Sequence, residues 1–309
     1  MKLVEKMLIT LLSLFVCNIP TACAENSSKQ IPVPDVEEAE SDVIQEQVPV
    51  TKVVSVHSKA MGRAIMNKVV VPDQYYDPDF QEDQFPVVYL LHGYDGDYNN
   101  WPDKAPLEDL ATEYSVIIVC PDGQDSWYFD SPINPKMQFE TYVSSELVSY
   151  IDDNYRTYAD ADFRAITGLS MGGHGALWLA WRHPDVFGSC GSMSGGVDIV
   201  PFPGKWKIAN ALGDYAGNKA VWESHSVMSL VPTLKPGQNI IIDDGDKDFF
   251  LEVNNKLHAA LMEKGIPHDY TIRPGAHSWT YWVNSLDYHM LFFSKCFDKA
   301  YQKRLDNKK

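Results

Sequence analysis

Short apolar runs alternate with longer stretches of helical pattern along most of this 309-residue chain. Two opening runs, "TKVVSVHS" and "RAIMNKVVVP", precede six that lack polar alternation, such as "PVVYLLHG" and "QNIIIDDG". Strands without a polar face must be covered on both sides, and parallel strands need crossover connections, usually helices. The alternation therefore predicts an α/β fold with a mostly parallel central sheet of about eight strands and helices on both faces. We expect strands near 51–58, 63–72, 86–93, 114–123, 164–170, 188–195, 238–245 and 268–275, and helices near 103–112, 139–153, 171–182, 251–264 and 279–298.

Both ends of the chain differ from this central part. Lys2, Lys6, the apolar run "MLITLLSLFVCNI" and the small residues around Cys23 are typical of an export signal over residues 1–24. A retained membrane anchor is the alternative, although a spanning helix needs about 20 apolar residues. Residues 25–50 are acidic and dotted with prolines, which predicts a disordered linker.

These segments predict one folded domain over residues 51–301, followed by a polar tail over 302–309. The expected location is outside the cytoplasm: periplasmic, extracellular or lipid-anchored at the cell surface. A membrane link is expected only through a possible lipid anchor at Cys23. The sequence leaves the oligomeric state open.

Charge and cysteine content narrow the possible partners. The formal net charge of −16 argues against nucleic acid or an anionic membrane as a general partner. Beyond the signal segment only Cys120, Cys190 and Cys296 remain, none with metal-type spacing. The carboxylates of "DDGDKDFF" alternate as in a calcium loop, but Phe249 occupies the glycine position and Asn255 the glutamate position. We therefore predict no metal site and no cofactor.

The stretch "ITGLSMGGHG" surrounds Ser170 with glycines. A phosphate-binding loop would require a lysine that is absent here, and the dinucleotide pattern G-x-G-x-x-G also fails. The pattern that fits is G-x-S-x-G between a strand and a helix, with the serine at the apex of a strained turn. Gly168 and Gly172 would then be needed because larger side chains would collide. The motif predicts an exposed nucleophilic hydroxyl.

A serine needs a base to take its proton, and in this kind of fold an acid and then a histidine follow the serine along the chain. His277 directly follows the last predicted strand. Asp248 is the first choice for the acid, with Asp246 second and Asp244 third. The backbone N–H groups of Met171 and Tyr94 are the expected oxyanion donors.

The matching segments include "VVYLLHGYDGDYNNW", "RAITGLSMGGHGALWLAWRHPDVFGSCGSMSG", "DDGDKDF" and "PGAHSWTYW". In family order and spacing, they resemble the putative-esterase branch of the α/β-hydrolases. This branch includes S-formylglutathione hydrolase (esterase D), tributyrin esterases, mycolyltransferases, and feruloyl and acetylxylan esterases of carbohydrate esterase family one. The resemblance covers most of residues 86–298 and implies an α/β-hydrolase fold.

By position, the resemblance assigns Ser170 as nucleophile, His277 as base and Asp248 as acid, with Tyr94 and Met171 as oxyanion donors. It also implies that Trp101, Trp127 and Tyr128 line the mouth of the substrate pocket, although ordinary packing explains such aromatic residues equally well. His174 stands where relatives often carry tyrosine or phenylalanine.

The resemblance and the export signal together predict a secreted serine esterase that removes feruloyl or acetyl groups from a plant polysaccharide such as xylan. An aromatic acyl group could stack on Trp127 or Tyr128. The alternatives are an S-formylglutathione hydrolase-like or short-chain general esterase, and an acyltransferase of the mycolyltransferase type. No residue in the sequence distinguishes ferulate from acetate as the acyl group.

Overall fold

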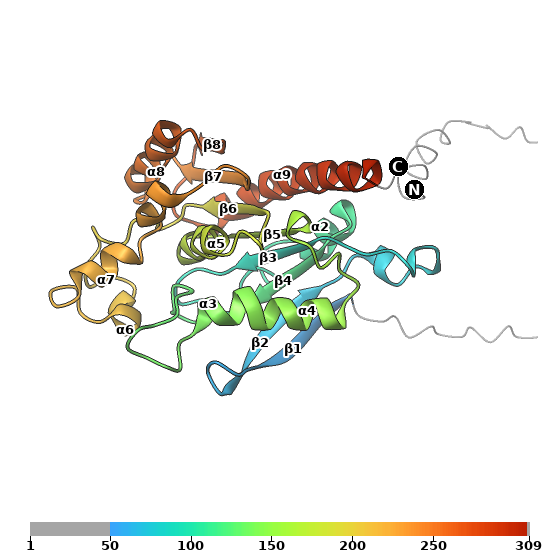
Figure 1. Ribbon diagram of the computed structural model, residues 1–309, viewed down its shortest axis with the longest axis horizontal. Coiled ribbons are helices and arrows are strands. Elements are labelled where there is room, and N and C mark those ends of the chain that lie inside the picture. Colours follow the sequence, from blue (N-terminus) through green and yellow to red (C-terminus); the bar gives the residue numbers. More distant parts are fainter. Residues whose placement is uncertain (1–49, 308–309) are drawn as a thin grey trace, which may run out of the picture. The chain divides into compact units, whose positions relative to one another are not determined.

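The computed structural model describes residues 50–307, and the predicted export signal lies outside these residues, as does nearly all of the predicted linker. Eight described strands form one sheet in the order β1-β2-β4-β3-β5-β6-β7-β8 (Figure 1). β1 pairs antiparallel with β2 and β2 with β4, whereas all pairs from β4 to β8 are parallel. This confirms the mostly parallel, eight-stranded sheet. The strands are β1 Thr51–Ser58, β2 Arg63–Val70, β3 Val87–Leu91, β4 Ile117–Pro121, β5 Arg164–Gly168, β6 Ser189–Met193, β7 Asn239–Gly245 and β8 Asp269–Arg273.

Helices cover both faces of the sheet, as the apolar strands require. On β3, Val87, Tyr89 and Leu91 belong to the core that includes the central helix α5, whereas Val88 and Leu90 belong to the core with α2 and α9. In Figure 1, α9 lies above β3, β4 and β5, and α4 lies below them. The longer helices are α2 Leu107–Tyr114, α4 Val148–Asn154, α5 Met171–Arg182, α8 Leu251–Lys264 and α9 Trp279–Asp306. A short helix α3, Phe139–Thr141, and a π-helical turn, Tyr142–Leu147, lead into α4.

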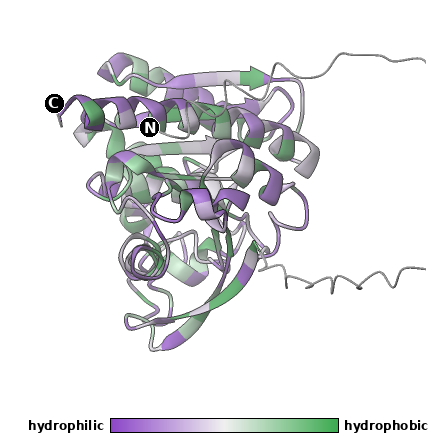
Figure 2. Cartoon of the chain, turned by 90° about the vertical axis from the view of Figure 1, so that its right-hand side faces the viewer, coloured by the Kyte–Doolittle hydropathy of each residue, from purple (hydrophilic) through white to green (hydrophobic). Residues whose placement is uncertain are grey.

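Two parts of the helical prediction were wrong. The closing helix α9 was expected to end near residue 298, but it continues to Asp306 and includes most of the predicted polar tail. Buried residues recur along α9 from Tyr281 to Phe297, and Figure 2 shows polar and apolar residues mixed along the helix that ends at the C label. The segment between β6 and β7 also contains three short helices with no long apolar period: α6 Ile208–Leu212, α7 Lys219–Ser224 and a 3-10 helix, Val227–Thr233.

The strand order locates the place where a ligand would bind. β3 lies between β4 and β5, and the helices that follow β3 and β5, α2 and α5, contribute to the cores on opposite faces of the sheet. In open α/β sheets such a reversal leaves a crevice beyond the carboxyl ends of the strands. The segments that begin at His92 and Leu169 leave β3 and β5 at this point. Within residues 50–307, no helix is long and apolar enough to cross a membrane.

Candidate active site

Ser170 lies at a sharp turn between β5 and α5. Its φ of 54° and ψ of −114° are strained for a residue with a side chain, at a cost of about 1–3 kcal/mol. A Cβ added to Gly168 would lie 2.7 Å from the carbonyl carbon and oxygen of Gly172, and one added to Gly172 would lie 2.6 Å from the carbonyl oxygens of Leu91 and His92. The two flanking glycines are therefore required sterically, as the sequence motif predicted.

The next two glycines of the motif allow α5 to approach its neighbours closely. A Cβ on Gly173 would lie 2.7 Å from Ser192 Oγ, and one on Gly175 would overlap the ring of Tyr128. Both positions lie in the first turns of α5, which is almost wholly buried. The helix thus holds Ser170 rigidly from its carboxyl side.

Three side chains from separate loops meet in a hydrogen-bonded chain. His277 Nε2 lies 2.9 Å from Ser170 Oγ, and His277 Nδ1 lies 2.8 Å from Asp248 Oδ2. The Asp248 carboxylate is fully buried and also accepts a 2.9 Å hydrogen bond from the Phe250 N–H. An acid in this position favours the tautomer in which Nδ1 carries the proton, so that Nε2 can accept the serine proton. Ser170 and His277 both remain partly accessible to solvent.

The two competing carboxylates are engaged elsewhere. Asp246 accepts a hydrogen bond from the Gly275 N–H, in the loop that leads to His277. Asp244 accepts hydrogen bonds from the Gly245 N–H and from Asn254 Nδ2. Burial, with the nearby charge of Asp248, raises the pKa of Asp244 to about 8. Of the three candidates, the structure therefore brings Asp248 to His277.

The two predicted oxyanion donors belong to the loops that flank the serine. Met171 is the first residue of α5, and Tyr94 follows β3 by three residues. Within residues 50–307, neither backbone N–H donates to a protein acceptor. A turn closed by the Gly96 N–H and the Gly93 carbonyl shapes the Tyr94 loop. Both donors therefore remain available for an anion that forms beside Ser170.

The aromatic residues predicted for the pocket mouth are buried instead. Trp101, Trp127 and Tyr128 are at most 1% exposed. Their polar atoms donate hydrogen bonds to the backbone carbonyls of Leu91, Trp206 and His92, respectively. The assignment to an open mouth was wrong, and the packing interpretation holds, because these rings support the loops that carry the site.

Another aromatic pair, which sequence reasoning missed, lies beside the histidine. Phe249 is 53% exposed, and its ring centroid lies 4.2 Å from that of His277. The half-buried Trp206 stacks on Phe249 with an interplanar angle of 16°. Phe249 directly follows the predicted acid, a signal that could have been read from the sequence. Trp206 comes from the insertion between β6 and β7, and its position beside Phe249 could not have been predicted from the sequence.

Other histidines have structural partners. His92 Nε2 accepts a hydrogen bond from the Gly123 N–H, while Nδ1 donates to the Gly93 carbonyl, so His92 shapes the loop that follows β3. His174 is fully buried against aromatic rings, and this burial lowers its pKa to about 3. His289 is buried beside Asp243, 3.1 Å away. Within the described chain, no group of three or more His, Cys, Asp or Glu side chains could hold a metal ion.

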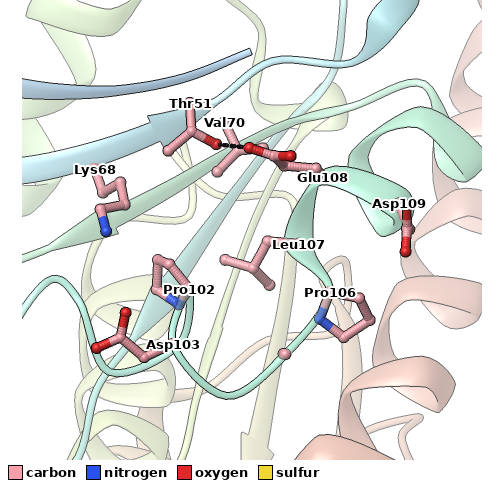
Figure 3. A pocket seen from close by; sticks show the side chains of 10 residues that line it. Thr51, Lys68, Val70, Pro102, Asp103, Pro106, Leu107, Glu108 and Asp109 are labelled. Carbon is pink, nitrogen blue, oxygen red and sulfur yellow. Dashed lines mark hydrogen bonds between the residues drawn. The ribbon is translucent and has the colours of Figure 1, made fainter. Parts of the chain in front are cut away.

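A cavity of about 400 Å³ between β2 and the N-terminal end of α2 is separate from this site. Figure 3 shows its lining, with Thr51 bonded to Glu108 on one wall and Lys68 and Asp103 among the remaining side chains. None of its lining residues belongs to the serine–histidine–aspartate group. The chemistry assigned to Ser170 therefore does not involve this cavity.

Comparison with known proteins agrees with the geometry. The family model described as putative esterase matches residues 58–293. The chain belongs to the putative-esterase family. It is 27% identical to an acetyl esterase of Caldicellulosiruptor saccharolyticus, over 68% of this chain and 84% of that protein. It is also 27% identical to an S-formylglutathione hydrolase of Paracoccus denitrificans, over 68% and 82% of the two chains.

A solved structure of a ferulic acid esterase superimposes with a TM-score of 0.68 and 28% identity, over 80% of this chain and 99% of that chain. The fold is therefore the α/β-hydrolase fold that the sequence motifs imply. Family and fold together support a carboxylic-ester hydrolase.

Proposed function

We propose that Ser170, His277 and Asp248 form the catalytic triad of an exported serine esterase. The observation that carries this proposal is the continuous chain of hydrogen bonds from Ser170 Oγ through His277 to the buried Asp248, starting at a strained turn. Strain and a buried charge cost free energy, and both are common at catalytic sites.

In the proposed reaction, Ser170 Oγ attacks the ester carbonyl carbon while His277 Nε2 takes the hydroxyl proton. The N–H groups of Tyr94 and Met171 donate to the oxyanion that forms. The carbon–oxygen bond then breaks, and His277 returns the proton to the leaving alcohol. Water repeats the sequence on the acyl-enzyme, which releases the acid and restores Ser170.

The proposed substrates are feruloyl or acetyl esters of a plant polysaccharide such as xylan. The similarity to a ferulic acid esterase and to an acetyl esterase supports this choice. The exposed Phe249 ring beside His277 supports an aromatic acyl group, which could stack on it. We also propose export, by the N-terminal signal pattern, to a periplasmic, extracellular or lipid-anchored location. Similarity to S-formylglutathione hydrolase keeps a small-acyl esterase as the second candidate.

The test is the initial rate on methyl ferulate and on acetylated xylan, with Ser170→Ala as the control. We expect release of ferulate or acetate by the native protein and almost complete loss in Ser170→Ala with the fold retained. Full activity of Ser170→Ala would refute the triad. Hydrolysis of S-formylglutathione alone, or acyl transfer to a sugar hydroxyl without hydrolysis, would replace the polysaccharide-esterase proposal.

A further inference from the structure

A lysine in the β6–β7 insertion links two walls of the candidate site. Lys207 Nζ lies 2.7 Å from Asp125 Oδ2, and it also lies over the ring of Tyr94, 5.3 Å from the centroid. The other carboxylate oxygen of Asp125 accepts a 2.9 Å hydrogen bond from the Asp95 N–H, next to the predicted oxyanion donor Tyr94. The Asp125 carboxylate therefore holds both the loop of Tyr94 and Asp95, called the oxyanion loop below, and the β6–β7 insertion.

The backbone on each side of this link is strained. Trp206 and Lys207 have φ values of 44° and 51°, and Asp95 has a φ of 60°. Residues with side chains rarely adopt this left-handed region, so the surrounding contacts must hold them there. For Trp206 these contacts include a hydrogen bond from Trp127 Nε1 to its carbonyl and stacking against Phe249. Lys207 itself is held by Asp125.

The strained conformation carries the aromatic pair to the site. Trp206 stacks on Phe249, and the Phe249 ring contacts the ring of His277. If Lys207 were released, the left-handed turn could relax and Trp206 would lose its fixed position. Phe249 would then lose the ring that covers it on the side of the insertion. The ion pair thus connects a surface lysine with the wall beside the reacting groups.

We propose that Lys207 and Asp125 are positioning residues that fasten the wall formed by Trp206 and Phe249 to the oxyanion loop, and so favour esters with an aromatic acyl group. This inference rests on the proposed esterase function. Lys207 acts on the wall, whereas Asp125 acts on both the wall and the Asp95 amide. The two residues therefore have separable effects: loss of the lysine weakens selection of the acyl group, and loss of the carboxylate also disturbs the oxyanion loop.

Accessibility makes the link sensitive to salt. The side chains of Lys207 and Asp125 are 50% and 22% exposed. An ion pair this exposed is screened by dissolved salt and contributes modestly, which limits its effect to about two- to five-fold. We therefore expect the preference for aromatic acyl groups to fall when salt rises from about 50 mM to about 1 M.

The experiment compares 4-nitrophenyl ferulate with 4-nitrophenyl acetate, two esters with the same leaving group. Lys207→Met should lower the ratio of kcat/KM values, ferulate over acetate, by about two- to five-fold, mainly by raising KM for ferulate. Lys207→Arg should restore the ratio. Asp125→Asn keeps an acceptor for the Asp95 N–H and should behave like Lys207→Met. Asp125→Ala removes that acceptor and should also lower kcat for both esters.

The control is Lys256→Met, which breaks an exposed pair of the same 2.7 Å length with Glu252 on α8. This variant should keep the selectivity and the salt response of the native protein, whereas Lys207→Met should lose the salt response. Selectivity and salt response that are unchanged in Lys207→Met would overturn the proposal, while full turnover would leave the esterase function intact.

A second measurement does not depend on activity. Trypsin cleavage after the exposed Lys205, followed by mass spectrometry, should be faster in Lys207→Met than in Lys256→Met, because release of the link frees the turn. If the native protein hydrolyses neither ester, the proposed function fails, and this cleavage rate still decides whether the link exists. Equal cleavage rates in the two variants would refute it.

Discussion

Substitution of Gly172 by alanine tests whether the turn at Ser170 is set by steric contact. The added Cβ would lie 2.6 Å from two carbonyl oxygens, those of Leu91 and His92. Ordinary van der Waals contact begins near 3.4 Å, so the turn at Ser170 and the end of β3 must separate by about 0.8 Å. Neither partner is a flexible side chain. Overpacking of this kind typically lowers the free energy of unfolding by about 1–3 kcal/mol, or the Tm by about 2–12 °C in a domain of this size.

The same displacement should affect turnover. Ser170 Oγ lies 2.9 Å from His277 Nε2, and a misplacement near 1 Å can cost about 100-fold in rate. We expect Gly172→Ala to fold with a lowered Tm and a kcat reduced by about 10- to 100-fold. The matched control is Gly217→Ala, where the nearest atom is the Asp214 carbonyl oxygen at 4.0 Å. Thermal unfolding and ester hydrolysis are measured on both variants. A Gly172→Ala protein that is as stable and as active as Gly217→Ala would refute the argument that steric contact sets the turn at Ser170.

Two further predictions concern single side chains. Asp248→Asn should lower kcat by about 10,000-fold, because the His277 tautomer is no longer fixed. The Asp246→Asn side chain can still accept a hydrogen bond from the Gly275 N–H, so this variant should stay within a few-fold of the native kcat. Equal losses of kcat in the two variants, measured in steady-state assays, would contradict the assignment of Asp248 as the acid. His174 has a pKa lowered by burial to about 3 from 6.5, so the stability it confers is present above pH 6.5 and is lost as the pH falls towards 3. Between pH 7 and pH 5 the free energy of unfolding should fall by about 2 kcal/mol because of His174. Denaturant titrations should find this contribution absent in His174→Phe. Equal losses of unfolding free energy in the native protein and in His174→Phe would exclude the effect.

The fold could be predicted because its strands carry their own pattern. Each of the eight expected strands forms, and the buried runs of β3 and β4 cannot be satisfied except within a covered sheet. The insertion between β6 and β7 could not be predicted in this way. Its helices α6 and α7 have five and six residues, too few for an apolar period to emerge. Their positions depend on contacts with distant loops.

The same division applies to the site. Ser170, Asp248 and His277 follow strands, so the carboxyl edge of a parallel sheet brings them together whatever the loops contain. The aromatic wall follows no such rule. Trp127, Tyr128 and Trp206 are all aromatic, so residue type does not separate them. Only the folded chain distinguishes the buried rings of Trp127 and Tyr128 from the half-buried ring of Trp206. Composition near a motif does not reveal which rings remain accessible beside the candidate site.

The proposed triad is positioned by the sheet, whereas the aromatic wall is positioned by the β6–β7 insertion. Turnover and acyl-group selectivity should therefore be able to change independently in this chain. The three groups of the proposed triad follow β5, β7 and β8, whose mutual register is fixed by ladder hydrogen bonds through the sheet. The wall beside them is held by a strained turn and one accessible ion pair, Lys207–Asp125, which single substitutions can alter without touching the sheet. Stability should therefore respond most to changes such as Gly172→Ala at the sheet edge. Preference among acyl groups should respond most to changes in the insertion, where the free-energy cost to the fold is small.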